Sequence, residues 1–81
     1  MSVTRIRFFA AARAAVGRDE FDVDARTLGD ALDAVAVEDA ERWAALRGRC
    51  AYLVDGVSTK DAATPLVGVE LVDVMPPFAG G

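Results

Sequence analysis

The first part of the chain alternates between apolar and polar positions with a period of two. In residues 3–9, Ile6 and Phe8 fall on one side, and the other side carries Arg5, Arg7 and Phe9. Residues 20–24 alternate in the same way around Phe21 and Val23. Side chains of a strand point alternately to opposite faces, so both segments are predicted to be half-buried strands. An alanine-rich helix over residues 10–16, closed by Gly17, would join them into an antiparallel pair.

A helical period replaces the alternation after Thr27, which is a favourable N-cap residue. Apolar residues then recur every three or four positions, at Leu28, Ala31, Leu32, Val35 and Ala36. This spacing predicts the main helix of the fold, with one face turned to the core. A second helical segment is expected over residues 38–47, with Trp43 and Leu46 packing inward and Gly48 ending it.

The last third of the chain returns to strand patterns. Residues 50–54 form a predicted strand, and Asp55-Gly56 after it is a strong hairpin signal. Residues 61–65 are expected to form a loop, and residues 69–75 the last strand. The helix crosses over between the early and late strands, so the first and last strands are expected to pair in parallel at the centre of one sheet. The predicted fold class is therefore α+β: a β-grasp (ubiquitin-like) fold with a mixed sheet of about five strands and one main helix packed across one face.

Composition limits the chemistry that the chain can perform with its own side chains. Its 81 residues suffice for one domain, and a hydrophobic share of 53% suffices for a core. There is no histidine, and Cys50 is the single cysteine, so neither a zinc site nor a Ser/Cys–His nucleophile can be assembled. We expect Cys50 to be a small buried residue, and we expect no metal, no permanently bound cofactor and no catalytic activity of the chain itself.

Charge and hydropathy indicate which partners and which cellular compartment to expect. The net charge is −4 without any basic run, which argues against nucleic-acid binding. No segment approaches the ~20 apolar residues of a membrane span, and Arg5 and Arg7 interrupt the first apolar run where a signal peptide would need it. A lone cysteine cannot form an internal disulfide and fits a reducing compartment. We therefore expect a cytoplasmic protein that does not contact membranes.

The most informative feature is the end of the sequence, where a strand runs into Pro76-Pro77 and then Phe78-Ala79-Gly80-Gly81. Proline lacks an N–H and fixes φ, so strand pairing must stop near Met75, and two prolines favour an extended segment. The last four residues could reach roughly 13 Å at about 3.3 Å per residue. A diglycine end fits a channel too narrow for any Cβ. We expect a β-grasp domain over residues 1–77 and a flexible tail over residues 78–81 that presents the carboxylate of Gly81; a frayed terminus is the alternative.

Three apolar residues are predicted to lie outside the core. Phe9 falls on the outward side of the first strand, and Met75 and Phe78 fall on or beyond the outward side of the last. If these strands are neighbours, the three residues form one patch, rimmed by Arg5, Arg7 and Arg13. Aromatic residues and Met with Arg at the rim are typical of protein interfaces. The alternative is that Phe9 and Phe78 belong to the core.

With these elements placed, the chain resembles the small, sulfur-carrying subunit of molybdopterin synthase, in the ubiquitin-like MoaD/ThiS family. The resemblance covers nearly the whole chain. It rests on the opening Arg5-Ile6-Arg7-Phe8-Phe9-Ala10, Arg13 before Val16-Gly17, Thr27-Leu28, Glu41-Arg42-Trp43-Ala44, Pro65-Leu66 and the ending from Met75 to Gly81. One departure is Val67-Gly68-Val69, where the family often carries an acidic residue and glycine.

The resemblance implies a mechanism. In this family an E1-like enzyme adenylates the terminal carboxylate with ATP, the acyl-adenylate becomes a thiocarboxylate, and the sulfur passes to a pterin precursor in the large subunit of molybdopterin synthase. Catalytic groups would lie on these partners, and the two subunits would form a heterotetramer. Gly81 would be the acceptor. Pro76, Pro77, Phe78, Ala79 and Gly80 would form the tail, and the partner contacts would be Phe9, Arg13, Met75 and Phe78.

Three other functions stay open at this point. The same ending serves sulfur carriers for thiazole or cysteine synthesis, although the Arg-Trp segment and the Pro-Pro-Phe-Ala-Gly-Gly ending favour the pterin pathway. A protein modifier would use the same activation step to join Gly81 to lysines. The third possibility is an interaction module whose tail is inert.

Overall fold

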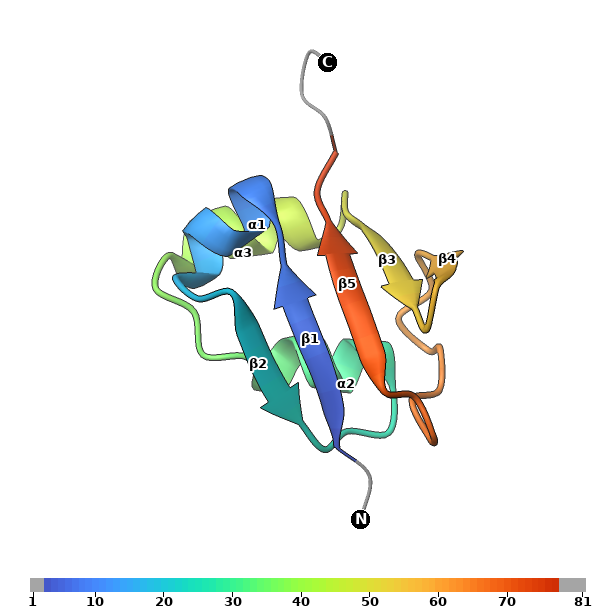
Figure 1. Ribbon diagram of the computed structural model, residues 1–81. Helices are drawn as coiled ribbons and strands as arrows, with labels where there is room; N and C mark the ends of the chain where they lie inside the picture. Colours follow the sequence, from blue (N-terminus) through green and yellow to red (C-terminus); the bar gives the residue numbers. More distant parts are fainter. Residues whose placement is uncertain (1–2, 78–81) are drawn as a thin grey trace.

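The computed structural model describes residues 3–77, in which five strands form one sheet in the order β2-β1-β5-β3-β4 (Figure 1). The two central strands, β1 (Thr4–Phe8) and β5 (Leu71–Met75), pair in parallel. On either side, β2 (Glu20–Val23) pairs antiparallel with β1, and β3 (Ala51–Val54) antiparallel with β5. This topology confirms the predicted β-grasp fold, including the parallel pairing of the first and last strands.

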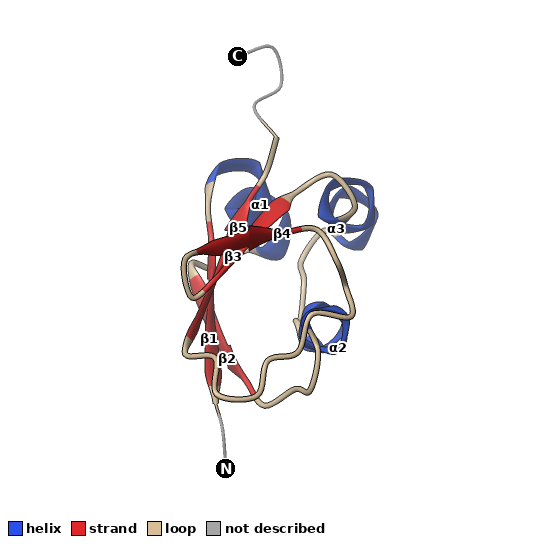
Figure 2. Cartoon of the chain, turned by 90° about the vertical axis from the view of Figure 1, so that its right-hand side faces the viewer, coloured by secondary structure: helices blue, strands red, loops and turns tan. Residues whose placement is uncertain are grey.

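The sheet buries one face and leaves the other open. The helices α2 (Leu28–Ala34) and α3 (Ala40–Arg47) lie on the same side of the sheet (Figure 2). The helix α1 (Ala10–Val16) follows β1 and packs against α3. Because alternate residues of a strand face opposite sides, one set of sheet side chains is buried beneath the helices. In the two central strands that inner set is Thr4, Ile6, Phe8, Val72 and Val74, of which the alternation predicts the four apolar members.

An aromatic contact ties the inner face of the sheet to α3. The rings of Phe8 and Trp43 meet edge to face, with centroids 5.9 Å apart and planes at 82°. Such a pair contributes about 0.5–1.5 kcal/mol beyond the area that it buries. Trp43 is only 4% exposed, so the prediction that it packs inward is confirmed.

The main helix is shorter than its sequence pattern predicts. It starts as expected, with the Thr27 hydroxyl accepting a hydrogen bond from the Asp30 N–H at 3.2 Å. It ends at Ala34, however; Val35 has extended backbone angles but stays buried, and Ala36 is exposed rather than part of the core face. Beyond it, the N–H groups of Glu38 and Asp39 donate to the carbonyls of Val16 and Ala15, which α1 leaves unpaired at its end. The chain leaves α2 early because this segment caps another helix.

The helical layer is therefore shared between α2 and α3 rather than formed by one long helix. Helix α3 begins at Ala40, not at Glu38, because the Asp39 carboxylate caps it by accepting from the Arg42 N–H at 3.1 Å. The strands are also slightly shorter than predicted: residues 3, 9, 24, 50, 69 and 70 lie outside them.

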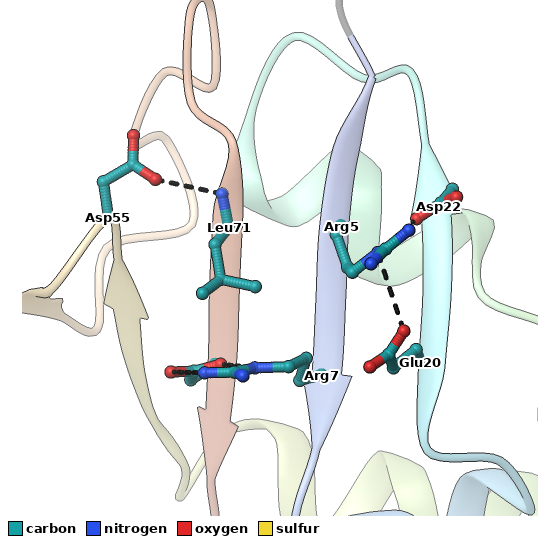
Figure 3. A network of polar contacts seen from close by, with 7 residues as sticks. Arg5, Arg7, Glu20, Asp22, Asp55 and Leu71 are labelled. Atoms are coloured by element: carbon teal, nitrogen blue, oxygen red, sulfur yellow. Dashed lines mark hydrogen bonds and ion pairs between the residues drawn. The ribbon is translucent and has the colours of Figure 1, made fainter.

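The Asp55-Gly56 hairpin is present and has a second role. It joins β3 to β4 (Val57–Thr59), with φ of 46° at Asp55 and 87° at Gly56, as a tight turn of this type requires. The Asp55 carboxylate also accepts hydrogen bonds from the N–H groups of Glu70 and Leu71, at 3.2 and 2.9 Å (the Leu71 bond is drawn in Figure 3). The turn thus fixes the start of the central strand β5.

Candidate functional site

The end of the described chain leaves the sheet from its centre. Since β1 and β5 are parallel, their carboxyl ends lie at the same edge, and the described chain continues from there through Pro76 and Pro77 (Figure 1). Met75 is the last residue of β5, which agrees with the predicted stop before the prolines. Phe78, Ala79, Gly80 and Gly81, the predicted tail, lie outside the described residues, so their role stays a prediction.

Phe9 and Met75 lie close to this exit. Phe8 of β1 pairs with Val74 of β5, and the residues that follow this pair in the sequence are Phe9 and Met75. Phe9 precedes α1 as its N-cap residue and is 38% exposed, so the alternative that it belongs to the core is wrong. Met75 is half-buried on the open face, opposite Ala51 of β3. Their use as partner contacts is a prediction that the geometry permits.

A shallow groove beside the exit brings Phe9 together with two predicted rim arginines. Its volume is about 240 Å³, and its lining consists of Arg7, Phe8, Phe9, Arg13, Asp19 and Glu20. Arg13, on α1, lies 3.5 Å from the Asp19 carboxylate, but both side chains are largely exposed, so the ion pair adds little stability. Arg13 is thus available to a partner.

The third predicted rim residue, Arg5, lies elsewhere. It is near the start of β1, where its Nε atom lies 3.1 Å from the Asp22 carboxylate and 3.6 Å from Glu20 (Figure 3). Both acidic neighbours raise the pKa of Arg5, the hydrogen bond to Asp22 most strongly. A larger hollow of about 310 Å³ borders Arg5, but it is at the far end of the strands from Met75 and holds none of the predicted contacts.

An ion pair that sequence reasoning missed occupies the middle of the open face. The Arg7 Nε and Nη2 atoms donate to the two oxygens of Asp73, at 2.7 and 3.0 Å. The hydrogen bond from Arg7 to Asp73 is the main reason why the pKa of Arg7 is raised. The two residues are directly opposite each other in the β1–β5 register. Once the strands were predicted to be parallel neighbours, that register could have revealed the pair.

The two titratable side chains that the core holds are poor reactants. Cys50 is 1% exposed, and burial raises the pKa of its thiol, which keeps it protonated at neutral pH. Burial likewise raises the pKa of Tyr52 far above its usual range, and its hydroxyl donates to the Arg47 carbonyl at 2.5 Å. Cys50 is thus a small buried residue, as predicted. Among residues 3–77, no three His, Cys, Asp or Glu side chains are grouped so as to hold a metal ion.

The fold and the exit of the chain define a small β-grasp protein of the ubiquitin-like kind. The model of the ThiS family matches residues 6–81, and the chain belongs to that family. Its members are non-catalytic sulfur carriers that interact with E1-like adenylating enzymes. No curated protein matches the chain. In the described part, no helix is long and apolar enough to cross a membrane.

Proposed function

We propose that this chain carries sulfur for molybdopterin synthesis, as a thiocarboxylate at Gly81. Residues 1–77 act as the docking domain and residues 78–81 as the tail that enters the partner enzymes. The observation that carries the proposal is the ending Met75-Pro76-Pro77-Phe78-Ala79-Gly80-Gly81, which follows the central strand of a ThiS-family fold. The Arg42-Trp43 segment supports the pterin pathway by its resemblance to the small synthase subunit.

The chemistry needs an unhindered carboxylate. One oxygen of the Gly81 carboxylate attacks the α-phosphorus of ATP and pyrophosphate leaves. A sulfur nucleophile then attacks the acyl carbon and AMP leaves, so the C–O bond to phosphate is replaced by a C–S bond. ATP is a substrate of the activating partner rather than a cofactor of this chain. The electrostatic stabilisation of both steps falls to that partner, whose site holds ATP and receives the carboxylate.

A carrier for thiazole synthesis is the second candidate, and the name of the matching family favours it. Both candidates share adenylation and sulfur loading and differ only in the protein that receives the sulfur. The large subunit of molybdopterin synthase is the expected recipient in the first case and a thiazole synthase in the second. Conjugation of Gly81 to lysines would indicate a protein modifier instead.

The test has two stages, of which the first asks whether Gly81 is loaded. The intact mass of the chain purified from cells establishes whether Gly81 carries the free carboxylate. Incubated with its adenylating enzyme, ATP and a sulfur donor, the chain should then gain the mass difference between sulfur and oxygen. A variant with one residue added after Gly81 keeps a carboxylate but moves it from the reaction centre, where about 1 Å of misplacement can cost ~100-fold in rate. If that variant is loaded as fast as the parent, Gly81 is not the acceptor.

The second stage identifies the recipient. The loaded chain is mixed separately with the large synthase subunit and a pterin precursor, and with a thiazole synthase and its substrates. Loss of the sulfur mass in the first mixture alone supports the proposal. Loss in the second mixture alone would replace it by the thiazole pathway, and a ladder of conjugates in cells would replace both by protein modification.

A further inference from the structure

The Arg7–Asp73 pair is held in one geometry before any partner arrives. The two carboxylate oxygens of Asp73 accept hydrogen bonds from the Nε and Nη2 atoms of Arg7, and the Asp73 side chain is only 15% exposed. The guanidinium carbon also lies 5.7 Å from the centroid of the Phe9 ring, within the range of a cation–π contact. Asp73 on β5 and Phe9, which links β1 to α1, therefore fix the orientation of Arg7. Figure 3 shows its side chain extending from β1 across β5.

This geometry leaves the outer edge of the guanidinium without a hydrogen-bond partner among residues 3–77. An arginine side chain has five N–H donors. Within residues 3–77, the Arg7 side chain donates hydrogen bonds only to Asp73, through one N–H on Nε and one on Nη2. Both N–H groups of Nη1 and the second one of Nη2 remain. The Arg7 side chain is 41% exposed, so water satisfies these donors in the free protein.

The family's adenylating enzyme must cover this part of the surface. Its ATP site has to reach Gly81, and the four residues after Pro77 can span only roughly 13 Å. The enzyme therefore contacts the edge of the sheet where β1 and β5 end, beside Phe9 and Arg7. Around Arg7 the open face also carries half-buried Leu53, Leu71 and Met75, so a close contact removes water from the ion pair.

The following inference rests on the proposed function. We propose that Arg7 is a specificity-determining residue for the docking of the adenylating enzyme. The enzyme places uncharged carbonyl oxygens against the three remaining N–H groups of Arg7. Asp73 and Phe9 are the positioning residues. Uncharged acceptors fit because Asp73 already neutralises the guanidinium, and the groove beside it balances Arg13 with Asp19 and Glu20, so no excess positive charge is left for a carboxylate. A partner without acceptors would displace water from three N–H donors and leave them unpaired. The unpaired donors would weaken the binding of that partner.

The decisive variant replaces the ion pair by an apolar pair, Arg7→Leu with Asp73→Leu. A merely apolar docking surface would bind this variant as well as the parent or better, because no ion pair is desolvated. If carbonyl oxygens of the enzyme accept hydrogen bonds from Arg7, they have no donor in this variant. The KM for the chain then rises roughly ten-fold or more, as expected for hydrogen bonds to a charged group. The kcat stays nearly unchanged, because the chemistry takes place at Gly81.

A matched control removes an ion pair from the helical side of the molecule. Arg47 and Asp33 lie 2.7 Å apart on α3 and α2, and the variant Arg47→Leu with Asp33→Leu should leave KM unchanged. A second double variant, Arg7→Asp with Asp73→Arg, keeps an ion pair across the strands but moves the guanidinium to β5. Its melting temperature should stay near that of the parent while its KM rises, which a purely structural role would not produce.

The measurement is ATP-dependent pyrophosphate release by the organism's own E1-like enzyme, with the full chain as the varied substrate. An unchanged or lower KM for the Leu/Leu variant overturns the inference and leaves the proposed function intact. If the KM ratio of variant to parent shrinks steeply as salt rises, the acceptor is a carboxylate and the choice of uncharged oxygens is wrong. Failure of the enzyme to adenylate the parent would instead overturn the proposed function.

Discussion

Replacing Leu32 by alanine tests the core between the helices and the inner face of the sheet. Leu32 is 4% exposed on α2 and belongs to the hydrophobic core. Truncating a buried leucine costs about 2–5 kcal/mol of unfolding free energy, depending on how much empty space remains. Leu32 also lines an existing cavity of about 150 Å³ whose lining includes the charged residues Arg47 and Lys60. Because the new space joins a cavity that water can reach, we expect a cost in the lower half of the range, about 2–3 kcal/mol.

The single tryptophan provides the assay. Trp43 is 4% exposed and contacts Phe8, so its fluorescence reports the loss of the core in urea. A domain of this length is stable by roughly 4–12 kcal/mol at about 0.05–0.15 kcal/mol per residue, so the midpoint should fall clearly at an unchanged slope. The melting temperature should drop by roughly 8–24 °C at about 4–8 °C per kcal/mol.

Leu53→Ala is the matched control for this prediction. Leu53 lies on β3 and is half-buried on the open face, so the same truncation leaves no enclosed cavity and should cost less. If Leu32→Ala unfolds at the parental midpoint, or loses no more stability than Leu53→Ala, then α2 does not cover the core as described.

Two further predictions concern the backbone and the titrating groups. Gly17→Ala should destabilise the protein by about 1–2 kcal/mol, since φ is +87° there and a Cβ is strained at that angle. The new Cβ would meet only the end of the exposed Glu38 side chain, which can move aside, so Gly56→Ala, with the same φ and open space around it, should cost about as much in urea unfolding. A clearly larger loss for Gly17→Ala would contradict this. The unfolding free energy should decline above about pH 8.5, because burial raises the pKa values of Cys50 and Tyr52 and the unfolded chain therefore loses these protons first. Cys50→Ala should delay the decline towards the range of tyrosine, and a flat profile up to pH 11 in the parent would contradict this assignment.

The sheet could be predicted because its information is local. Strict alternation in β1 and β5 assigns Ile6, Phe8, Val72 and Val74 to one face without reference to any other segment, and the structure buries all four. The hairpin signal Asp55-Gly56 is equally local, since a positive φ suits only a few residue types. Parallel pairing of β1 and β5 then follows from the crossover, so even the topology needed little long-range information.

The end of α2 could not be predicted from the local pattern. Val35 and Ala36 continue the helical period, and only the hydrogen bonds from Glu38 and Asp39 to the end of α1 show why the helix stops. These bonds join segments that are far apart in sequence, and no periodicity encodes them. The start of α3 differs, because Asp39 is a favourable N-cap residue and marks the first turn within the sequence itself.

The candidate site also has features that the sequence predicts and features that depend on long-range packing. The outward positions of Phe9 and Met75 and the stop at the prolines follow from the sequence near the ends of two strands. The groove, by contrast, needs Asp19, just before β2, and Glu20, the first residue of β2. The distance between Arg5 and the exit follows from the direction of β1, which the predicted topology already contained. The Arg7–Asp73 pair follows from the β1–β5 register, so what the sequence could not show is how Arg13 of α1 and the residues around the start of β2 come together beside Phe9 to line the groove.

The construction of the domain suggests how affinity and rate are divided between its parts. β5 is held by β1 on one side, by β3 on the other and by Asp55 at its start, so the point from which the tail departs is well fixed. Four residues follow Pro77, however, and glycine at positions 80 and 81 imposes little preference on the backbone dihedrals. The fixed sheet edge therefore cannot by itself place a reacting carbon to within the ~1 Å that catalysis requires. Under the proposed function that precision comes from the channel of the partner, so changes at Arg7 or Phe9 should act on KM, and changes at Gly80 or Gly81 on kcat.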